Sequence, residues 1–237
     1  MRYLAHTAHW QFLGLIAGLL AWILLMAATG LNEWRLWRVD DVSVVTSGVA
    51  WVGIWRACFY SHALPEAETC RAIGLSFAPA EVAAAQVLMV VSLTCGLAAN
   101  VGAAVAMRLV YFSVEGRGNV RPAFVLAGTA YLLAGTICLV PLAWNARSVL
   151  KNCSIEFPPE FQLPAAPAAQ RVGAAVGVGA VAAVLMLASG LLFLCHRYAR
   201  KGPSAEAPKD AGDPPRDPRA PGRQGRDNAA FHTEEVS

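Results

Sequence analysis

The sequence predicts a membrane protein with four transmembrane helices and a small extracellular β-sheet. Its 237 residues are 56% hydrophobic and only 15% charged, whereas about a quarter of the residues in a soluble domain are charged. Four stretches contain no Asp, Glu, Lys or Arg, and each is long enough to cross about 30 Å of hydrocarbon as a helix. They predict spans at about 10–31, 82–107, 122–145 and 172–195. The segment between the first two spans has the composition of β-strands.

The first span has an alternative interpretation. Arg2, the apolar run after it and the small residues Ala27 and Ala28 are also features of a cleaved signal peptide. The apolar run exceeds the usual length of about 7–15 residues, and it is bordered by Trp10 and Trp22. We therefore expect a retained helix.

Basic residues next to the spans predict that both termini are cytoplasmic. These residues follow the second or fourth span or precede the third: Arg108, Arg117, Arg121, Arg197, Arg200 and Lys201. Loops rich in Lys and Arg remain on the cytoplasmic side. The loops at about 32–81 and 146–171 are then extracellular, and residues 1–200 form one membrane domain. The tail at 201–237 is rich in Pro, Gly, Asp and Arg, so we expect it to be disordered and cytoplasmic.

The first extracellular loop carries the features of a small sheet. β-branched residues recur in a partly alternating pattern from Val39 to Val52, and Gly48 and Gly53 mark turns or bulges. We expect three to five antiparallel strands, because a lone hairpin is marginally stable. Cys58 and Cys70 are close enough in sequence to close a short loop as a disulfide, which an extracellular location permits. Such a bond contributes roughly 3 kcal/mol.

Polar and cysteine residues within the spans point to packing. Gln86 and Asn100 lie inside the second span, where interhelical hydrogen bonds are their expected role. Cys95 and Cys138 are expected to be inert packing residues.

Two further cysteines lie at the ends of the spans. Cys195 ends the fourth span and is either an S-palmitoylation site or a plain interfacial cysteine. Cys153, in the second extracellular loop, is either a free thiol or an intermolecular bridge. In the same loop Phe157 and Phe161 either contact another molecule or return to the outer leaflet.

Several function classes are excluded by what the chain lacks. The spans hold no charged residue of the kind that marks proton and ion pathways, and no nucleophile–base pair lies at membrane depth, so we expect neither an enzyme nor a transporter. No Cys/His grouping predicts a metal site, and no cofactor is expected. The net charge of +3 gives no case for nucleic-acid binding.

Trp34-Arg35, Gly53-Ile54-Trp55, Cys58 and Cys70, combined with four spans, resemble the claudin family, whose pattern is Trp, Gly-Leu-Trp, Cys and Cys. The likeness continues through 83–92, 134–144 and 170–175 and covers roughly 10–198. It places the chain in the claudin and peripheral-myelin-protein superfamily, as a divergent member.

The resemblance implies a left-handed four-helix bundle under an extracellular sheet. It also implies cis polymerisation and trans adhesion, with itself and other claudins, into tight-junction strands of the plasma membrane that seal or ion-selectively tune the paracellular space. The alternative within the superfamily is an auxiliary subunit of a channel or a growth-arrest-type membrane protein.

The resemblance assigns roles to individual residues. Trp34, Gly53 and Trp55 would anchor the sheet to the bundle. Arg71 matches a position at which the family carries a selectivity charge, and Glu66 and Glu68 would oppose its effect on ions. 

The chain departs from the family's pattern at three places. Gln86 replaces an arginine at the start of the second span, and the second loop lacks the usual aromatic Phe-Tyr-Asn-Pro-like turn. The chain ends in Ser237 where the family ends in a hydrophobic residue, so ordinary PDZ scaffolding is not expected.

Overall fold

A computed structural model describes residues 9–39, 45–61, 64–75, 78–112, 121–153, 155 and 167–195. Within these residues, four helices and five strands belong to one compact unit. The tail expected at 201–237 lies outside the described residues.

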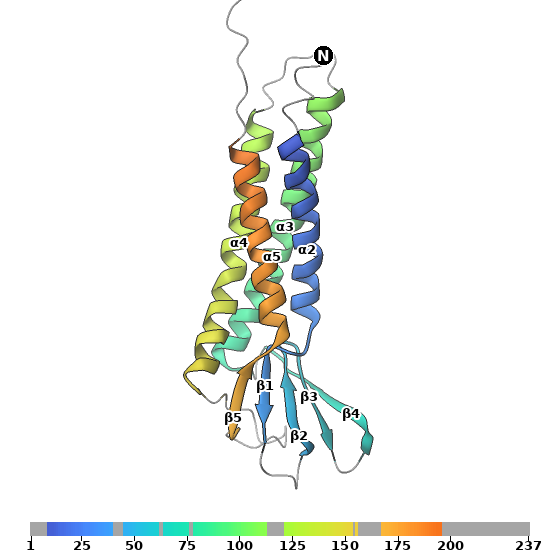
Figure 1. Ribbon diagram of the computed structural model, residues 1–237, viewed down its shortest axis with the longest axis vertical. Coiled ribbons are helices and arrows are strands. Elements are labelled where there is room, and N and C mark those ends of the chain that lie inside the picture. The colour runs from blue at the N-terminus through green and yellow to red at the C-terminus, as the bar shows by residue number, and fades with distance from the viewer. Residues whose placement is uncertain are drawn as a thin grey trace, which may run out of the picture. The chain divides into compact units, whose positions relative to one another are not determined.

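The four helices are α2 (His9–Gly30), α3 (Ala80–Phe112), α4 (Arg121–Leu150) and α5 (Ala174–Leu194). Each is long and apolar enough to cross a membrane, which confirms the four predicted spans. α3 and α4 continue beyond the predicted hydrophobic stretches, and α4 passes through Pro141 before it ends at Leu150. The helices form a bundle in which α2 and α4 both pack against α5, and α3 packs against α4 (Figure 1).

Small residues bring the helices close together. A Cβ atom added at Gly18 of α2 would overlap the hydroxyl of Tyr131 on α4. At Gly190 of α5 the added atom would lie 2.9 Å from the carbonyl oxygen of Gly128 on α4. The Tyr131 hydroxyl donates to Asn100 Oδ1 on α3 at 2.7 Å. This bond confirms the interhelical role predicted for Asn100, in a setting where small interfacial residues let polar groups meet across helices.

The five strands form one antiparallel sheet at one end of the bundle (Figure 1). In chain order they are β1 (Arg35–Arg38), β2 (Val45–Val52), β3 (Arg56–Ser61), β4 (Leu64–Ala72) and β5 (Ala169–Val172). The order across the sheet is β4-β3-β2-β1-β5. The first loop supplies four strands. The fifth comes from the end of the second loop and pairs with β1, which the sequence analysis did not predict.

The faces of the sheet differ in burial. Cross-strand neighbours share a face because side chains alternate along each strand. One row runs from Val172 through Arg35, Val52 and Ala57 to Arg71. Its three central residues are at most 1% exposed, and its two end residues are exposed. The buried part of this face lies against the bundle and places Arg35 at the boundary between sheet and helices.

Candidate functional site

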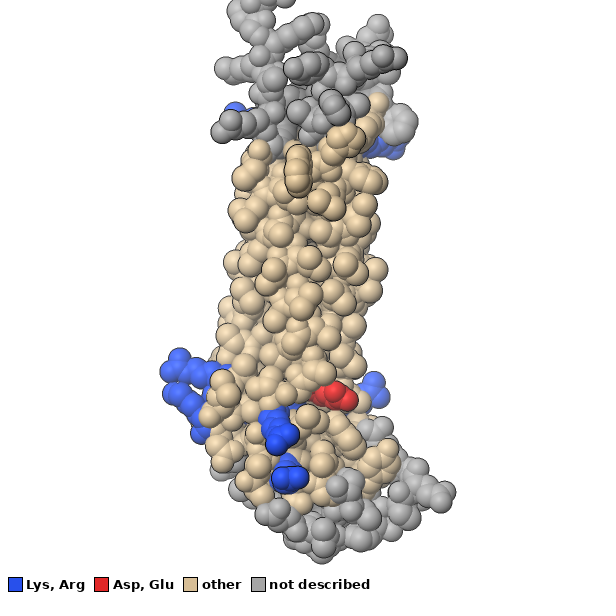
Figure 2. Space-filling model, in the orientation of Figure 1, with Lys and Arg blue, Asp and Glu red and all other residues tan. Residues whose placement is uncertain are grey.

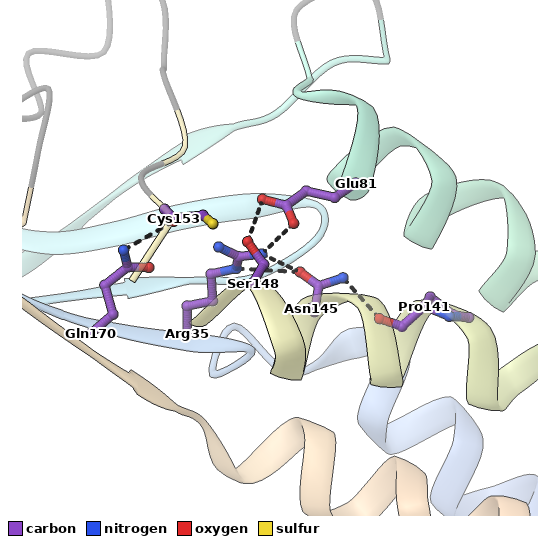
Figure 3. A network of polar contacts seen from close by, with 7 residues as sticks. All are labelled: Arg35, Glu81, Pro141, Asn145, Ser148, Cys153 and Gln170. Carbon is purple, nitrogen blue, oxygen red and sulfur yellow. Dashed lines mark hydrogen bonds and ion pairs between the residues drawn. The ribbon is translucent and has the colours of Figure 1, made fainter. Parts of the chain in front are cut away.

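Arg35 is the centre of the junction between the sheet and the bundle. It begins β1, and its side chain is 1% exposed. Nη2 lies 2.8 Å from Glu81 Oε2, in the first turn of α3. Nη2 and Nε also donate to Asn145 Oδ1 on α4, at 3.0 and 3.3 Å (Figure 3). One side chain therefore joins the first strand to two helices.

The partners of Arg35 are themselves held in place. Ser148 Oγ donates to Glu81 Oε1 at 3.3 Å, and Asn145 Nδ2 donates to the Pro141 carbonyl at 3.0 Å (Figure 3). A guanidinium with fixed carboxylate and amide partners is held in one orientation. The network is a rigid connection between β1 and the sheet end of α3 and α4.

Burial is the largest influence on the pKa of Arg35 in this network. Loss of solvent lowers the pKa of Arg35 below its ordinary value, and the nearby Glu81 carboxylate opposes that shift. A charge on the sulfur of Cys153 acts in the same direction as Glu81. An arginine so far from water remains tolerable because Glu81 compensates its charge.

Gln86 makes a second connection from α3. Its Nε2 donates to the carbonyl oxygens of Ile54 and Ile73 at 2.6 and 3.0 Å. The interhelical bond predicted for Gln86 is therefore wrong. The side chain is buried at the sheet end of α3, where the accessible acceptors are carbonyls of the chain next to β3 and β4.

Trp34 and Gly53 lie where α2 meets the sheet. The Trp34 ring is 1% exposed, and its Nε1 donates to the carbonyl of Ala28 at 2.9 Å. A Cβ atom added at Gly53 would lie 2.9 Å from the Cα atom of Asn32 and 3.1 Å from the Arg56 carbonyl oxygen. Only glycine leaves room for this close approach of two backbone segments.

The anchoring role expected for Trp55 stays a prediction, and its side chain lies differently from that of its neighbour. Its side chain is 38% exposed, whereas that of the preceding Ile54 is 1% exposed. The turn between β2 and β3 directs Ile54 into the core and Trp55 away from it. Trp55 contributes its carbonyl oxygen, which accepts from the Ile73 N–H at 2.7 Å.

The predicted disulfide is confirmed. Cys58 on β3 and Cys70 on β4 are bonded and occupy paired positions in the sheet. Cys58 Sγ also accepts from Asn32 Nδ2 at 3.4 Å. The bond fastens the edge strand β4 to its neighbour β3.

The family model for PMP-22/EMP/MP20/claudin tight junction proteins matches residues 19–195. The chain belongs to this family. It is a claudin-like tight-junction protein that crosses the membrane several times, in a family of junction proteins and not of enzymes.

Curated relatives agree with this assignment. Claudin-5 of Mus musculus is 29% identical over 199 residues, covering 83% of this chain and 86% of its own length. Claudin-2 of Bos taurus is 29% identical over 196 residues, covering 81% and 80%. Claudin-4 of Canis lupus familiaris is 28% identical over 189 residues, covering 78% and 85%.

The remaining predicted site residues lie apart from the junction. Arg71 is exposed on β4. Glu66 and Glu68 also lie on β4, but their side chains, like Phe157 and Phe161 entirely, are outside the described residues. Cys195 is exposed at the end of α5. Within the described part of the chain, no group of His, Cys, Asp and Glu could hold a metal ion.

Sequence reasoning missed the partners of Arg35. Glu81 is suited to its position by the helix dipole, but nothing local indicates its contact with Arg35. Asn145 is 110 positions from Arg35. The one available signal was a charged residue shortly after a transmembrane span and next to Trp34.

Proposed function

We propose that this claudin-family chain polymerises side by side in the plasma membrane and contacts the opposing cell, forming strands that seal or tune the paracellular space. The buried network around Arg35 is the observation that supports this most directly. A strand whose sheets bridge two cells needs each sheet held at a fixed angle to its own helices, and the network provides that attachment. The partners are further copies of the chain, other claudins and membrane lipids.

The orientation follows from the basic flanks of the spans, which favour cytoplasmic termini. The sheet then lies outside the cell. In this arrangement Phe157 and Phe161 of the second loop are the proposed trans contacts, and Cys195 at the opposite end of α5 is the proposed palmitoylation site.

The charge of the sheet end supports an effect on ion passage. The exposed charged side chains described there are basic, and Figure 2 shows basic side chains, with a partly buried acidic one among them, next to an uncharged helical surface. The residues are Arg38, Arg56, Arg71, Arg147, Lys151 and Arg171. Fixed positive charge disfavours cations by field and desolvation. Arg71 is the proposed selectivity charge.

Arg71→Glu tests the selectivity proposal in an epithelial monolayer. We expect the sodium-to-chloride permeability ratio to rise, with Arg71→Gln giving an intermediate value, because Arg71→Gln lowers the charge by one unit and Arg71→Glu lowers it by two. Arg147→Glu, at the end of α4, is the matched control. A ratio unchanged in Arg71→Glu would remove this residue from the ion path.

Freeze-fracture imaging tests strand formation. The full chain is expressed in cells that have no strands of their own, and continuous strands at contacts between two expressing cells are the expected result. Diffuse protein without strands contradicts autonomous polymerisation. If a co-expressed claudin then restores strands, the chain is a co-polymer; if localisation instead follows a channel partner, the auxiliary-subunit alternative holds.

A further inference from the structure

The sheet has a second face, opposite the one that carries Arg35. Cross-strand neighbours share a face, and the central row of this second face runs across all five strands: Arg171, Leu36, Trp51, Cys58 and Cys70. Arg171 is exposed, and Leu36 and Trp51 are half-buried. The face is therefore accessible over β5, β1 and β2.

The charged side chains that the structure describes on this second face are three exposed arginines. Arg38 lies two residues after Leu36 on β1, and Arg56 lies two residues before Cys58 on β3, so alternation places both on the face of Arg171. None of the three arginines forms an ion pair with another described residue. Their positive charge is available to a ligand.

Two aromatic rings lie among these arginines. Trp51 on β2 and Tyr60 on β3 are half-buried, and their ring centroids are 5.8 Å apart in an edge-to-face arrangement. This contact holds both rings in place while part of each remains accessible. Glu68 pairs with Tyr60 on the edge strand β4, so the basic and aromatic part of the face is confined to the other four strands. We call it the basic aromatic face: Arg38, Arg56, Arg171, Trp51 and Tyr60.

The arginines of the basic aromatic face are too far apart to bind one small anion together. The spacing of residues and strands in a sheet puts the Cα atoms of Arg38 and Arg171 about 8 Å apart, and those of Arg38 and Arg56 about 17 Å apart. Side chains stand roughly perpendicular to a sheet, so the guanidinium groups keep a similar spacing. Figure 2 shows basic side chains at the sheet end that are separated by uncharged surface. This spacing fits a chain-like ligand with repeated negative charges.

We propose that the basic aromatic face binds a sulfated polysaccharide of the extracellular space, the chemical class of heparan sulfate. A guanidinium presents parallel N–H donors that match a planar or tetrahedral oxyanion such as a sulfate group. The C–H face of a sugar ring packs on the electron-rich face of an aromatic ring, which Trp51 and Tyr60 supply. Sulfate groups repeat along the polysaccharide, as the arginines are spaced along the sheet. The inference goes beyond the proposed function and shares with it only the extracellular orientation of the sheet.

Two other anionic ligands fit this face less well. A lipid headgroup lies at the ends of the helices, whereas β1 runs away from the bundle and Arg38 is at its outer end (Figure 1). An acidic peptide strand binds a sheet through the backbone groups of an edge. The strands β1, β2 and β3 are paired on both sides, so their part of the face offers side chains only.

The test measures the Kd of the full chain, purified in detergent, for a heparin oligosaccharide of defined length. The comparison ligands are the same oligosaccharide without its sulfate groups and a polyglutamate peptide of equal charge. Arg38→Gln/Arg171→Gln is the test variant. Arg71→Gln/Arg147→Gln is the matched control, because it also removes two exposed arginines at the sheet end, one from the opposite face of the sheet and one from α4.

We expect Arg38→Gln/Arg171→Gln to raise the Kd for the sulfated oligosaccharide roughly 10-fold, and Arg71→Gln/Arg147→Gln to change it less than about 2-fold. The test variant should also weaken the dependence of the Kd on salt concentration, since fewer ionic contacts form. Trp51→Leu removes the ring but no charge, so it should weaken binding and leave the salt dependence unchanged. If Trp51→Leu does not fold, the two arginine variants decide the question.

Three results would overturn the proposal. Equal weakening by the two arginine variants would mean that the oligosaccharide responds to the overall charge of the sheet end and not to this face. Equal affinity for the oligosaccharide without sulfate groups would exclude the arginines as its binding groups. Equal or tighter binding of polyglutamate would make an acidic protein segment the partner.

A second measurement on intact cells separates this inference from the proposed function. Cells that make no heparan sulfate express the chain and are exposed to fluorescent heparin oligosaccharide. Leu75, which is 61% exposed after β4, is replaced by cysteine in a Cys153→Ser background and labelled with a membrane-impermeant maleimide. Labelling of Leu75→Cys without oligosaccharide binding rejects the polysaccharide site alone. Labelling only after the cells are permeabilised means that the sheet is not extracellular, which contradicts the proposed function as well.

Discussion

Removal of the Glu81 carboxylate should destabilise the whole domain. Arg35 is 1% exposed and Glu81 is 13% exposed, and their closest atoms are 2.8 Å apart. Glu81→Ala leaves the guanidinium buried without its counterion, which costs about 3–5 kcal/mol. For a domain of this size, that loss corresponds to a fall in Tm of roughly 6–20 °C.

The assay is thermal unfolding of the purified full chain in detergent, followed by tryptophan fluorescence. Arg38→Ala is the matched control, because Arg38 lies on the same strand but is exposed, and its Tm should stay close to that of the unmodified chain. The double variant Arg35→Met/Glu81→Leu removes both charges and should recover much of the loss, since replacing a buried ion pair by apolar residues is often neutral.

The comparison between variants decides the interpretation. If Glu81→Ala unfolds at the same temperature as Arg38→Ala, the ion pair does not stabilise the junction. If the double variant is as unstable as Glu81→Ala, the loss comes from the hydrogen bonds of Asn145 and Ser148 and not from an uncompensated charge.

Three other changes test the rest of the attachment. Cys58→Ser removes a bond worth roughly 3 kcal/mol, so the protein should be retained inside the cell. Surface biotinylation measures the amount at the cell surface, with Cys153→Ser as the control. Normal surface delivery of Cys58→Ser would contradict this prediction. Gln86→Leu leaves the Ile54 and Ile73 carbonyls without their side-chain donor and should cost about 1–3 kcal/mol, seen as a lower Tm, whereas an unchanged Tm would show that other donors replace it. Gly18→Ala forces a methyl group against the Tyr131 hydroxyl, which should cost about 1–3 kcal/mol and lower the Tm. Gly30→Ala is the control, because a Cβ added there meets nothing within 4 Å, and its Tm should be close to that of the unmodified chain.

Local chemistry explains why the sequence predicted so much of this fold. A long uncharged stretch crosses a membrane as a helix wherever it occurs, because only a helix satisfies its backbone groups without outside partners. The four spans therefore depend on composition alone. The Cys58–Cys70 bond was predictable for a similar reason, since the two residues are 12 positions apart and lie on neighbouring strands.

The orientation of individual side chains and their hydrogen-bond partners were harder to predict. In the turn after β2, Ile54 is 1% exposed and Trp55 is 38% exposed. Composition does not predict which of two neighbouring apolar side chains in a turn faces the core. Gln86 was expected to bond to a helix and instead meets two carbonyls of the loop, because those acceptors are the ones that lie at the sheet end of α3.

The sequence by itself determined the four spans, the position of the sheet between the first two and the disulfide that closes it, because each depends on residues near one another in the chain. Only the tertiary structure decided that β5 joins the sheet from the second loop and that Arg35, Glu81, Asn145 and Ser148 meet. These residues come from β1, α3 and α4. Their contact exists only after the helices have packed and excluded the water that each polar group would otherwise bind.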